Sequence, residues 1–200
     1  MIEIEKKFLL TADEQRALLD GANAHGEKLV EDSYFDTDDY QLTSKNFWFR
    51  ERDGVYELKA PLQSTSQTNA TNRYDEITDI EGISQKLNLP LGDDFPAIIA
   101  AAGIKKFVTC YTVRNSYEKA GFHIDVDKAT YLGSAFEYAV AEIELLIDDE
   151  SQADDAESRI ITFAKQFDLT TDQKIIGKIG AYLKVEKPEH YQLLINAGVF

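Results

Sequence analysis

The sequence predicts an α+β fold: a closed antiparallel β-barrel with helices packed outside it and a helical segment near its C-terminal end. Two observations support this prediction. About seven or eight segments alternate apolar residues with charged or polar ones, which is the period of a strand with two different faces. The charged faces also sort by sign, with acids on some strands and bases on others. A closed barrel would let both sets face one wet lumen, while the apolar faces pack under helices.

Composition limits the class of protein. The 200 residues suit one domain, and 44% hydrophobic residues are enough for a core. The single cysteine, Cys110, excludes an internal disulfide framework and fits a reducing cytoplasm. We expect no membrane span, because no run of about 18 apolar residues occurs, and no secretion signal. A net charge of −15 argues against a broad nucleic-acid surface but allows a small anionic ligand.

The first predicted strand runs from Met1 to Phe8. Glu3, Glu5 and Lys7 share one of its faces, and apolar residues share the other. Two neighbouring carboxylates repel each other, and a divalent cation, which prefers oxygen ligands, would turn that repulsion into chelation. A solvated outer face is the alternative interpretation of this strand on its own.

A helix and a second strand are predicted next. Residues Thr11 to Glu14 have the form of a capping box, which opens a helix. Residues 30–37 form the second predicted strand, on which Tyr34 and Asp36 share one face.

Residues 47–60 are predicted to form a hairpin. Asp53-Gly54 is a strong signal for a two-residue turn, which would pair residue 52 with 55, 50 with 57 and 48 with 59. One face then carries Trp48, Arg50, Arg52, Glu57 and Lys59. Exposed bases are normally interspersed with acids, so this concentration of bases favours an anion site over a solvated face.

Four more strands are predicted, at residues 74–80, 107–118, 122–127 and 139–147. Their polar faces include Tyr74, Glu76, Arg114, His123, Asp125, Asp127, Glu142 and Glu144. Of these, His123 is interpreted as a structural histidine. Further helices are predicted at residues 83–89, 95–102, 154–167, 178–184 and 189–195. The polar residues 63–72 predict a loop.

A lumen lined by opposed charges predicts a ligand, because unpaired buried charges are costly. A polyphosphate with Mg²⁺ or Mn²⁺ fits, since bases bind phosphate oxygens while acids bind the metal. The sequence contains no G-x-x-x-x-G-K-[ST] phosphate loop and no G-x-S-x-G turn.

The pattern of these residues resembles that of a known family. Glu3-Ile4-Glu5-Lys6-Lys7 matches the E-x-E-x-K signature of the CYTH superfamily, the triphosphate tunnel metalloenzymes, and is most similar to its thiamine triphosphatase branch. The resemblance implies one domain over residues 1–200 with a closed eight-stranded barrel. It extends over Tyr34 to Thr37, Trp48 to Arg52, Glu57 to Lys59, Tyr74 to Glu76, Asp125 to Asp127, Ala139 to Glu144, Lys178 to Leu183 and Lys187 to Leu194.

The resemblance also implies roles for matching positions. The triphosphate would be bound by Lys7, Arg50, Arg52, Lys59, Arg114 and Lys178. One or two Mg²⁺ or Mn²⁺ ions would be held by Glu3, Glu5, Asp125, Asp127, Glu142 and Glu144. Trp48 and Tyr74 would contact the organic moiety, with the indole stacked on a cationic heterocycle. Lys59 and Tyr34 would position or deprotonate the attacking water, with Asp36, Glu57 and Glu76 in support.

The expected activity is hydrolysis of thiamine triphosphate to thiamine diphosphate and phosphate. Alternatives are a class IV adenylyl cyclase, an inorganic triphosphatase and a non-catalytic polyphosphate-binding module. Cyclases usually carry a His-Phe pair before the signature, and this chain begins two residues before Glu3, which disfavours the cyclase. We expect a cytoplasmic monomer or weak homodimer that acts on a small molecule, without nucleic-acid or membrane partners.

Overall fold

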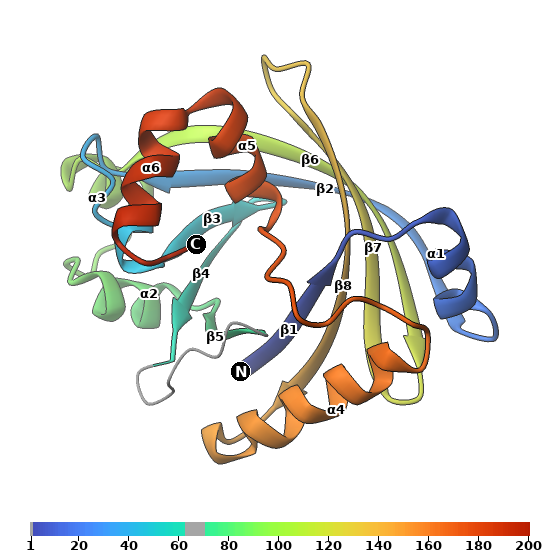
Figure 1. Cartoon of the computed structure of the whole chain (residues 1–200). Coiled ribbons are helices and arrows are strands. Elements are labelled where there is room, and N and C mark those ends of the chain that lie inside the picture. Colours follow the sequence, from blue (N-terminus) through green and yellow to red (C-terminus); the bar gives the residue numbers. More distant parts are fainter. Residues whose placement is uncertain (1, 63–70) are drawn as a thin grey trace.

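A computed structural model describes residues 2–62 and 71–200. Among these residues eight strands form a closed barrel in the order β1-β5-β4-β3-β2-β6-β7-β8 (Figure 1). The strands are β1 (Ile2–Phe8), β2 (Asn23–Asp36), β3 (Trp48–Arg52), β4 (Val55–Pro61), β5 (Asn72–Ile77), β6 (Lys105–Lys119), β7 (Phe122–Tyr131) and β8 (Glu137–Ile147). All neighbouring pairs are antiparallel, which confirms the predicted closed barrel. Most of the predicted loop at residues 63–72 lies outside the described residues.

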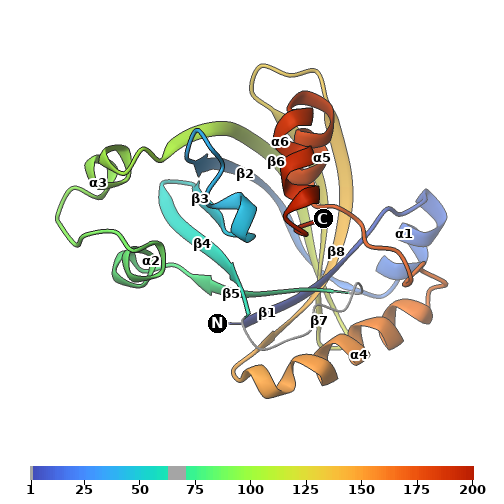
Figure 2. The same cartoon turned by 60° about the vertical axis from the view of Figure 1, so that its left-hand side comes forward.

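The helices lie outside the barrel and at one of its ends (Figures 1 and 2). They are α1 (Ala12–Leu19), α2 (Ile80–Leu87), α3 (Phe95–Ala101), α4 (Ala153–Lys165), α5 (Lys178–Glu186) and α6 (Pro188–Asn196), with short 3₁₀ turns η1 (Thr43–Lys45) and η2 (Glu150–Gln152). The predicted capping box is present. The Glu14 backbone N–H donates to the Thr11 hydroxyl, and the Thr11 backbone N–H donates to the Glu14 carboxylate. None of the helices in the described part of the chain is long and apolar enough to cross a membrane.

Strand β1 closes the barrel. It pairs with β5 on one side and with β8 on the other. Glu5 is therefore aligned with Asn72 of β5 and with Glu144 of β8. Side chains at aligned positions of neighbouring strands share a face, so the Glu3 and Glu5 face of β1 meets the acidic face of β8.

The predicted hairpin is confirmed in its register. Arg52 pairs with Val55, Arg50 with Glu57 and Trp48 with Lys59. The turn residues Asp53 and Gly54 both have positive φ, 49° and 86°, as a primed two-residue turn requires.

Strand β2 is longer than predicted. The sequence predicts a strand over residues 30–37, but β2 starts at Asn23 and pairs with β6 over almost its whole length. An irregularity between Ala24 and Gly26 interrupts the alternation of side chains in the missed part. A second register shift lies between Tyr34 and Phe35, where β6 carries one extra residue.

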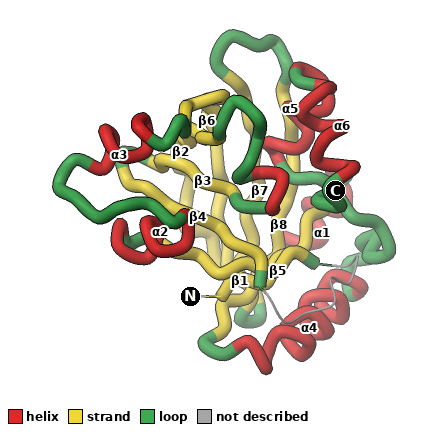
Figure 3. Tube along the Cα trace, turned by 90° about the vertical axis from the view of Figure 1, so that its left-hand side faces the viewer, coloured by secondary structure: helices red, strands yellow, loops and turns green. Residues whose placement is uncertain are grey.

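Three buried clusters hold the helices to the barrel. The outer faces of β1, β7 and β8 pack against α1 and α4, with Ile143 and Ile160 fully buried. The outer face of the β3–β4 hairpin packs against α2 and α3, which lie beside it in Figure 3. The third cluster lies at one end of the barrel, where α5 and α6 cover Tyr34, Cys110 and Tyr131. The first residue of α5, Lys178, lies at the lumen.

Candidate active site

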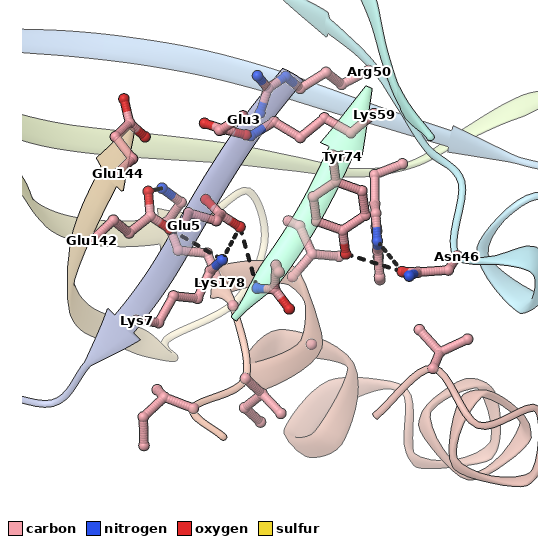
Figure 4. Close-up of a pocket in the computed structure, with 18 of the residues that line it drawn as sticks. Glu3, Glu5, Lys7, Asn46, Arg50, Lys59, Tyr74, Glu142, Glu144 and Lys178 are labelled. Atoms are coloured by element: carbon pink, nitrogen blue, oxygen red, sulfur yellow. Dashed lines mark hydrogen bonds and ion pairs between the residues drawn. The ribbon is translucent and has the colours of Figure 1, made fainter. Parts of the chain in front are cut away.

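A cavity of about 220 Å³ occupies the barrel lumen (Figure 4). Its walls come from strands β1 to β6 and β8, from the segment 174–180 that includes the start of α5, and from the last two residues of the chain. All six bases predicted to bind phosphate line it: Lys7, Arg50, Arg52, Lys59, Arg114 and Lys178. Strand alternation turns five of these residues inward, closure of the barrel brings them together, and Lys178 reaches the lumen from the first residue of α5.

Three carboxylates meet on the wall formed by β1 and β8. Glu3, Glu5 and Glu144 each offer an oxygen, and these oxygens lie within 4.8 Å of one another. Glu3 and Glu5 are 6% and 4% exposed, so water screens their repulsion poorly. Burial, together with the neighbouring Glu3 carboxylate, raises the pKa of the Glu144 carboxyl.

This cluster fits a divalent cation. Two buried carboxylates and the partly buried Glu144 supply hard oxygen ligands, and their mutual repulsion is relieved when a cation binds between them. The donor set matches the preferences of Mg²⁺ and Mn²⁺, as predicted from the first strand.

Lys59 lies against the acids of β1. Its ammonium contacts the Glu3 carboxylate and lies 4.0 Å from Glu76. Burial opposes the charge of Lys59, but Glu3 and Glu5 outweigh burial and raise the pKa of the ammonium. Of the two roles predicted for Lys59, positioning the attacking water agrees with this environment better than deprotonating it.

Acidic side chains fix the positions of two arginines. Arg50 contacts Glu57 at 2.6 Å and Glu76 at 3.3 Å. Arg52 donates two hydrogen bonds to Asp32, of 2.8 and 3.0 Å. Asp32 was not among the predicted site residues, although it precedes Tyr34 on the same face of β2. These acids orient the guanidinium groups toward the lumen and compensate their buried charge.

Arg114 and Lys178 separate two predicted metal ligands from the cavity. Arg114 donates to Asp127 at 2.8 and 2.6 Å and also contacts Asp125. Lys178 contacts Asp127 as well. Asp125 and Asp127 are each 1% exposed and do not line the cavity, whereas Glu142 does. In this arrangement Asp127 orients two bases and lies outside the group formed by Glu3, Glu5 and Glu144.

An aromatic group lines another part of the cavity. Trp48 and Tyr74, both predicted, donate to the Asn46 side-chain oxygen at 2.8 and 3.1 Å. Phe200 packs against Trp48, with ring centroids 6.0 Å apart, and stacks on Tyr191. Asn46 and Phe200 were missed because each lies in a segment without strand periodicity.

Asp36, predicted as a supporting residue, lies outside the cavity. Its carboxylate accepts hydrogen bonds from the backbone of Leu42 and Thr43 and from the Thr43 hydroxyl. It does not line the cavity, and it fixes the 37–43 loop that leads to Asn46. Its effect on the site is therefore indirect.

Comparisons with known proteins agree with this arrangement. The CYTH domain family matches residues 1–176 of the chain. The thiamine-triphosphatases of Macaca fascicularis and Homo sapiens are similar at 27% and 25% identity, and each alignment covers 99% of this chain and 91% of the relative. A solved structure from Pyrococcus horikoshii shares the fold with a TM-score of 0.65 and 15% identity, over 91% of this chain and 98% of that one.

Proposed function

The chain belongs to the CYTH domain family, and we propose that it is a metal-dependent hydrolase that releases the terminal phosphate of an organic triphosphate. Thiamine triphosphate is the leading substrate, because the relatives that match the whole chain are thiamine-triphosphatases. The observation that carries the proposal is the cavity, in which six bases and a three-carboxylate cluster face each other. Such a site matches a polyanion that carries a divalent cation.

The bases bind and orient the phosphate chain. Arg50 and Arg52 present planar guanidinium groups that their acidic partners hold in place, which suits two-point contacts with phosphate oxygens. Lys7 and Lys178 supply compact charges from β1 and from the first residue of α5. Because Lys7, Arg50 and Lys178 are each less than 10% exposed, water screens their charges poorly.

Glu3, Glu5 and Glu144 would hold the metal ion, with Glu142 beside them. The ion, when bound, neutralises phosphate charge and polarises the phosphoryl group for attack. The contribution of the chain is a fixed set of carboxylates, whose positions follow from the register of β1 against β8.

Lys59 and Tyr34 would orient the attacking water. The Tyr34 hydroxyl lies 3.4 Å from Arg50 Nη1, and Tyr34 and Lys59 both line the cavity. The pKa of the Tyr34 hydroxyl is raised by burial, so both groups act as hydrogen-bond donors and not as bases at neutral pH. Orientation of the water then depends on these two donors and on the fixed position of the phosphate.

Trp48, Tyr74 and Phe200 would receive the organic part of the substrate. A cationic heterocycle over an indole face gains about 0.5–2 kcal/mol. An inorganic triphosphate gains nothing from these rings, so the aromatic group separates the two substrate classes.

A substrate panel tests the proposal. Thiamine triphosphate, ATP and inorganic triphosphate are each incubated with Mg²⁺ or Mn²⁺, and orthophosphate and pyrophosphate are measured. We expect orthophosphate from thiamine triphosphate, loss of activity with chelator and in Glu5→Gln, and no loss in Glu27→Gln, an exposed acid outside the cavity.

The alternatives give different products. Pyrophosphate with cyclic AMP from ATP identifies the cyclase, and the highest activity on inorganic triphosphate identifies that substrate. Tight triphosphate binding by calorimetry without turnover identifies the non-catalytic module, and any of these results overturns the proposal. We further propose one domain over residues 1–200 that acts in the cytoplasm as a monomer or weak homodimer, consistent with the single buried Cys110.

A further inference from the structure

A second group of potential metal ligands adjoins the three-carboxylate cluster. His123, Asp125 and Glu144 each offer one ligand atom, and these atoms lie within 4.8 Å of one another. His123 Nε2 lies 3.1 Å from Asp125 Oδ1 and 4.0 Å from a Glu144 oxygen. The His123 side chain, interpreted from the sequence as a structural histidine, is 42% exposed, so an ion can reach its imidazole.

The barrel register produces this group. His123 of β7 lies directly opposite Glu144 of β8, and Asp125 follows two residues later on the same face. The row continues onto β1, where Glu5 is aligned with Glu144 on its other side. Glu144 therefore belongs to both ligand groups and lies between them.

Asp125 is oriented by its neighbours in a way that suits a ligand. The Ser116 hydroxyl donates to Asp125 Oδ1 at 2.6 Å, and Arg114 contacts the opposite oxygen, Oδ2. Hydrogen bonds of this kind fix the orientation of carboxylates that bind metals. Oδ1 is the oxygen that faces His123.

We propose that His123, Asp125 and Glu144 form a second divalent-cation site, with an imidazole ligand, that shares Glu144 with the Glu3–Glu5–Glu144 cluster. The shared cluster rests on the proposed function, whereas the imidazole ligand is a new assignment. A nitrogen donor changes which ion the site prefers. Imidazole suits Co²⁺ and Zn²⁺ and is also accepted by Mn²⁺, whereas Mg²⁺ prefers oxygen ligands only. The second site therefore selects a transition ion next to an all-oxygen site that accepts Mg²⁺.

Pulsed electron paramagnetic resonance of the Mn²⁺-loaded protein, without any triphosphate, tests the assignment. In the unmodified protein we expect modulation from a coordinated imidazole ¹⁴N. When the histidines carry ¹⁵N, this modulation should be replaced by the pattern of ¹⁵N. The signal should be lost in His123→Gln and kept in His25→Gln, an exposed histidine outside the cavity. A missing nitrogen signal in the unmodified protein overturns the proposal, and so does a signal that survives in His123→Gln.

Metal affinity gives an independent measurement. His123→Gln should weaken Co²⁺ binding by at least about 10-fold, with a much smaller change for Mg²⁺. An equal change for both ions overturns the proposal. Because neither measurement involves a substrate, failure of the triphosphatase assay would leave the nitrogen assignment standing. Loss of the nitrogen signal alone would leave the triphosphatase proposal standing.

Discussion

The Lys59 ammonium of β4 contacts the Glu3 carboxylate of β1, although β5 lies between these two strands. The contact therefore spans part of the lumen and joins the basic wall to the acidic wall. It also raises the pKa of Lys59, against the effect of burial. A lysine that stays charged binds phosphate and orients water.

Lys59→Arg and Lys59→Ala distinguish this role from general-base catalysis. Arginine keeps the charge and the donors but cannot accept a proton at neutral pH. We expect kcat/KM with thiamine triphosphate to stay at least about 10-fold higher in Lys59→Arg than in Lys59→Ala, the equivalent of about 1.4 kcal/mol. Equal losses of kcat/KM in the two variants, within the range of about 10²–10⁴ typical of a lost base, would show that Lys59 acts as a base and contradict the positioning role.

Gly180→Ala tests the part played by Phe200. A Cβ at Gly180 would lie 2.8 Å from Phe200 Cζ, so the ring must move. We expect the KM for thiamine triphosphate to rise by about 2–10-fold, as loss of an aromatic contact predicts, with no change for inorganic triphosphate. Phe200→Ala should have the same effect, and the double variant should be no worse than Phe200→Ala. Additive effects would show that the two positions act separately.

His190 links stability to pH. Its Nε2 lies 2.8 Å from the Thr43 hydroxyl, which itself donates to Asp36, and its ring stacks on Tyr40. Burial lowers the pKa of His190 from 6.5 to about 4. The unfolded chain therefore binds a proton that the folded chain does not, and the free energy of unfolding falls as pH drops from about 6.5 to about 4.

We expect His190→Gln to remove about 2–3 kcal/mol of this fall, measured by urea unfolding across the same pH range. His25→Gln, at an exposed histidine, should keep the slope of the unmodified protein. An unchanged slope in His190→Gln would show that other groups cause the pH dependence.

Glu157 of α4 is predicted to stabilise the fold without affecting catalysis. It accepts from Arg73 of β5 at 2.6 Å, and both side chains are nearly buried. Glu157→Ala leaves a buried arginine without its main partner, which costs about 3–5 kcal/mol of unfolding free energy. Asp154→Ala is the matched control, because Asp154 contacts the same arginine but is 90% exposed, and its loss should cost about 1 kcal/mol or less. The KM should stay unchanged in both variants, and similar losses of stability would contradict the prediction.

Much of the barrel could be predicted because strand alternation is a local property. The Asp53–Gly54 turn alone determines which residues of the hairpin face each other, and the structure has that register. Five of the six bases share one cavity for the same reason, whereas Lys178 enters it from α5. The start of β2 was missed because the irregularity at Ala24 and Gly26 breaks the alternation on which the prediction depends.

Other parts of the site depend on contacts between distant segments. Phe200 reaches Trp48 only because α6 packs at the end of the barrel, and nothing in the local sequence indicates that approach. Likewise, Arg114 and Lys178 pair with Asp127 across different elements, so the sequence could count these charges but could not divide them into ligands and orienting partners.

The position of β1 also affects how the chain folds. Its first residues pair with the end of β8, Ile2 with Ile147, so the last contacts of the barrel join segments far apart in sequence. Such high contact order predicts slow folding. While the chain is being synthesised, one edge of β1 can pair with β5, but the other cannot pair until β8 has emerged from the ribosome, and an open edge is a template for aggregation. Chaperone assistance during synthesis should therefore raise the yield of this protein more than that of a helical protein of equal length.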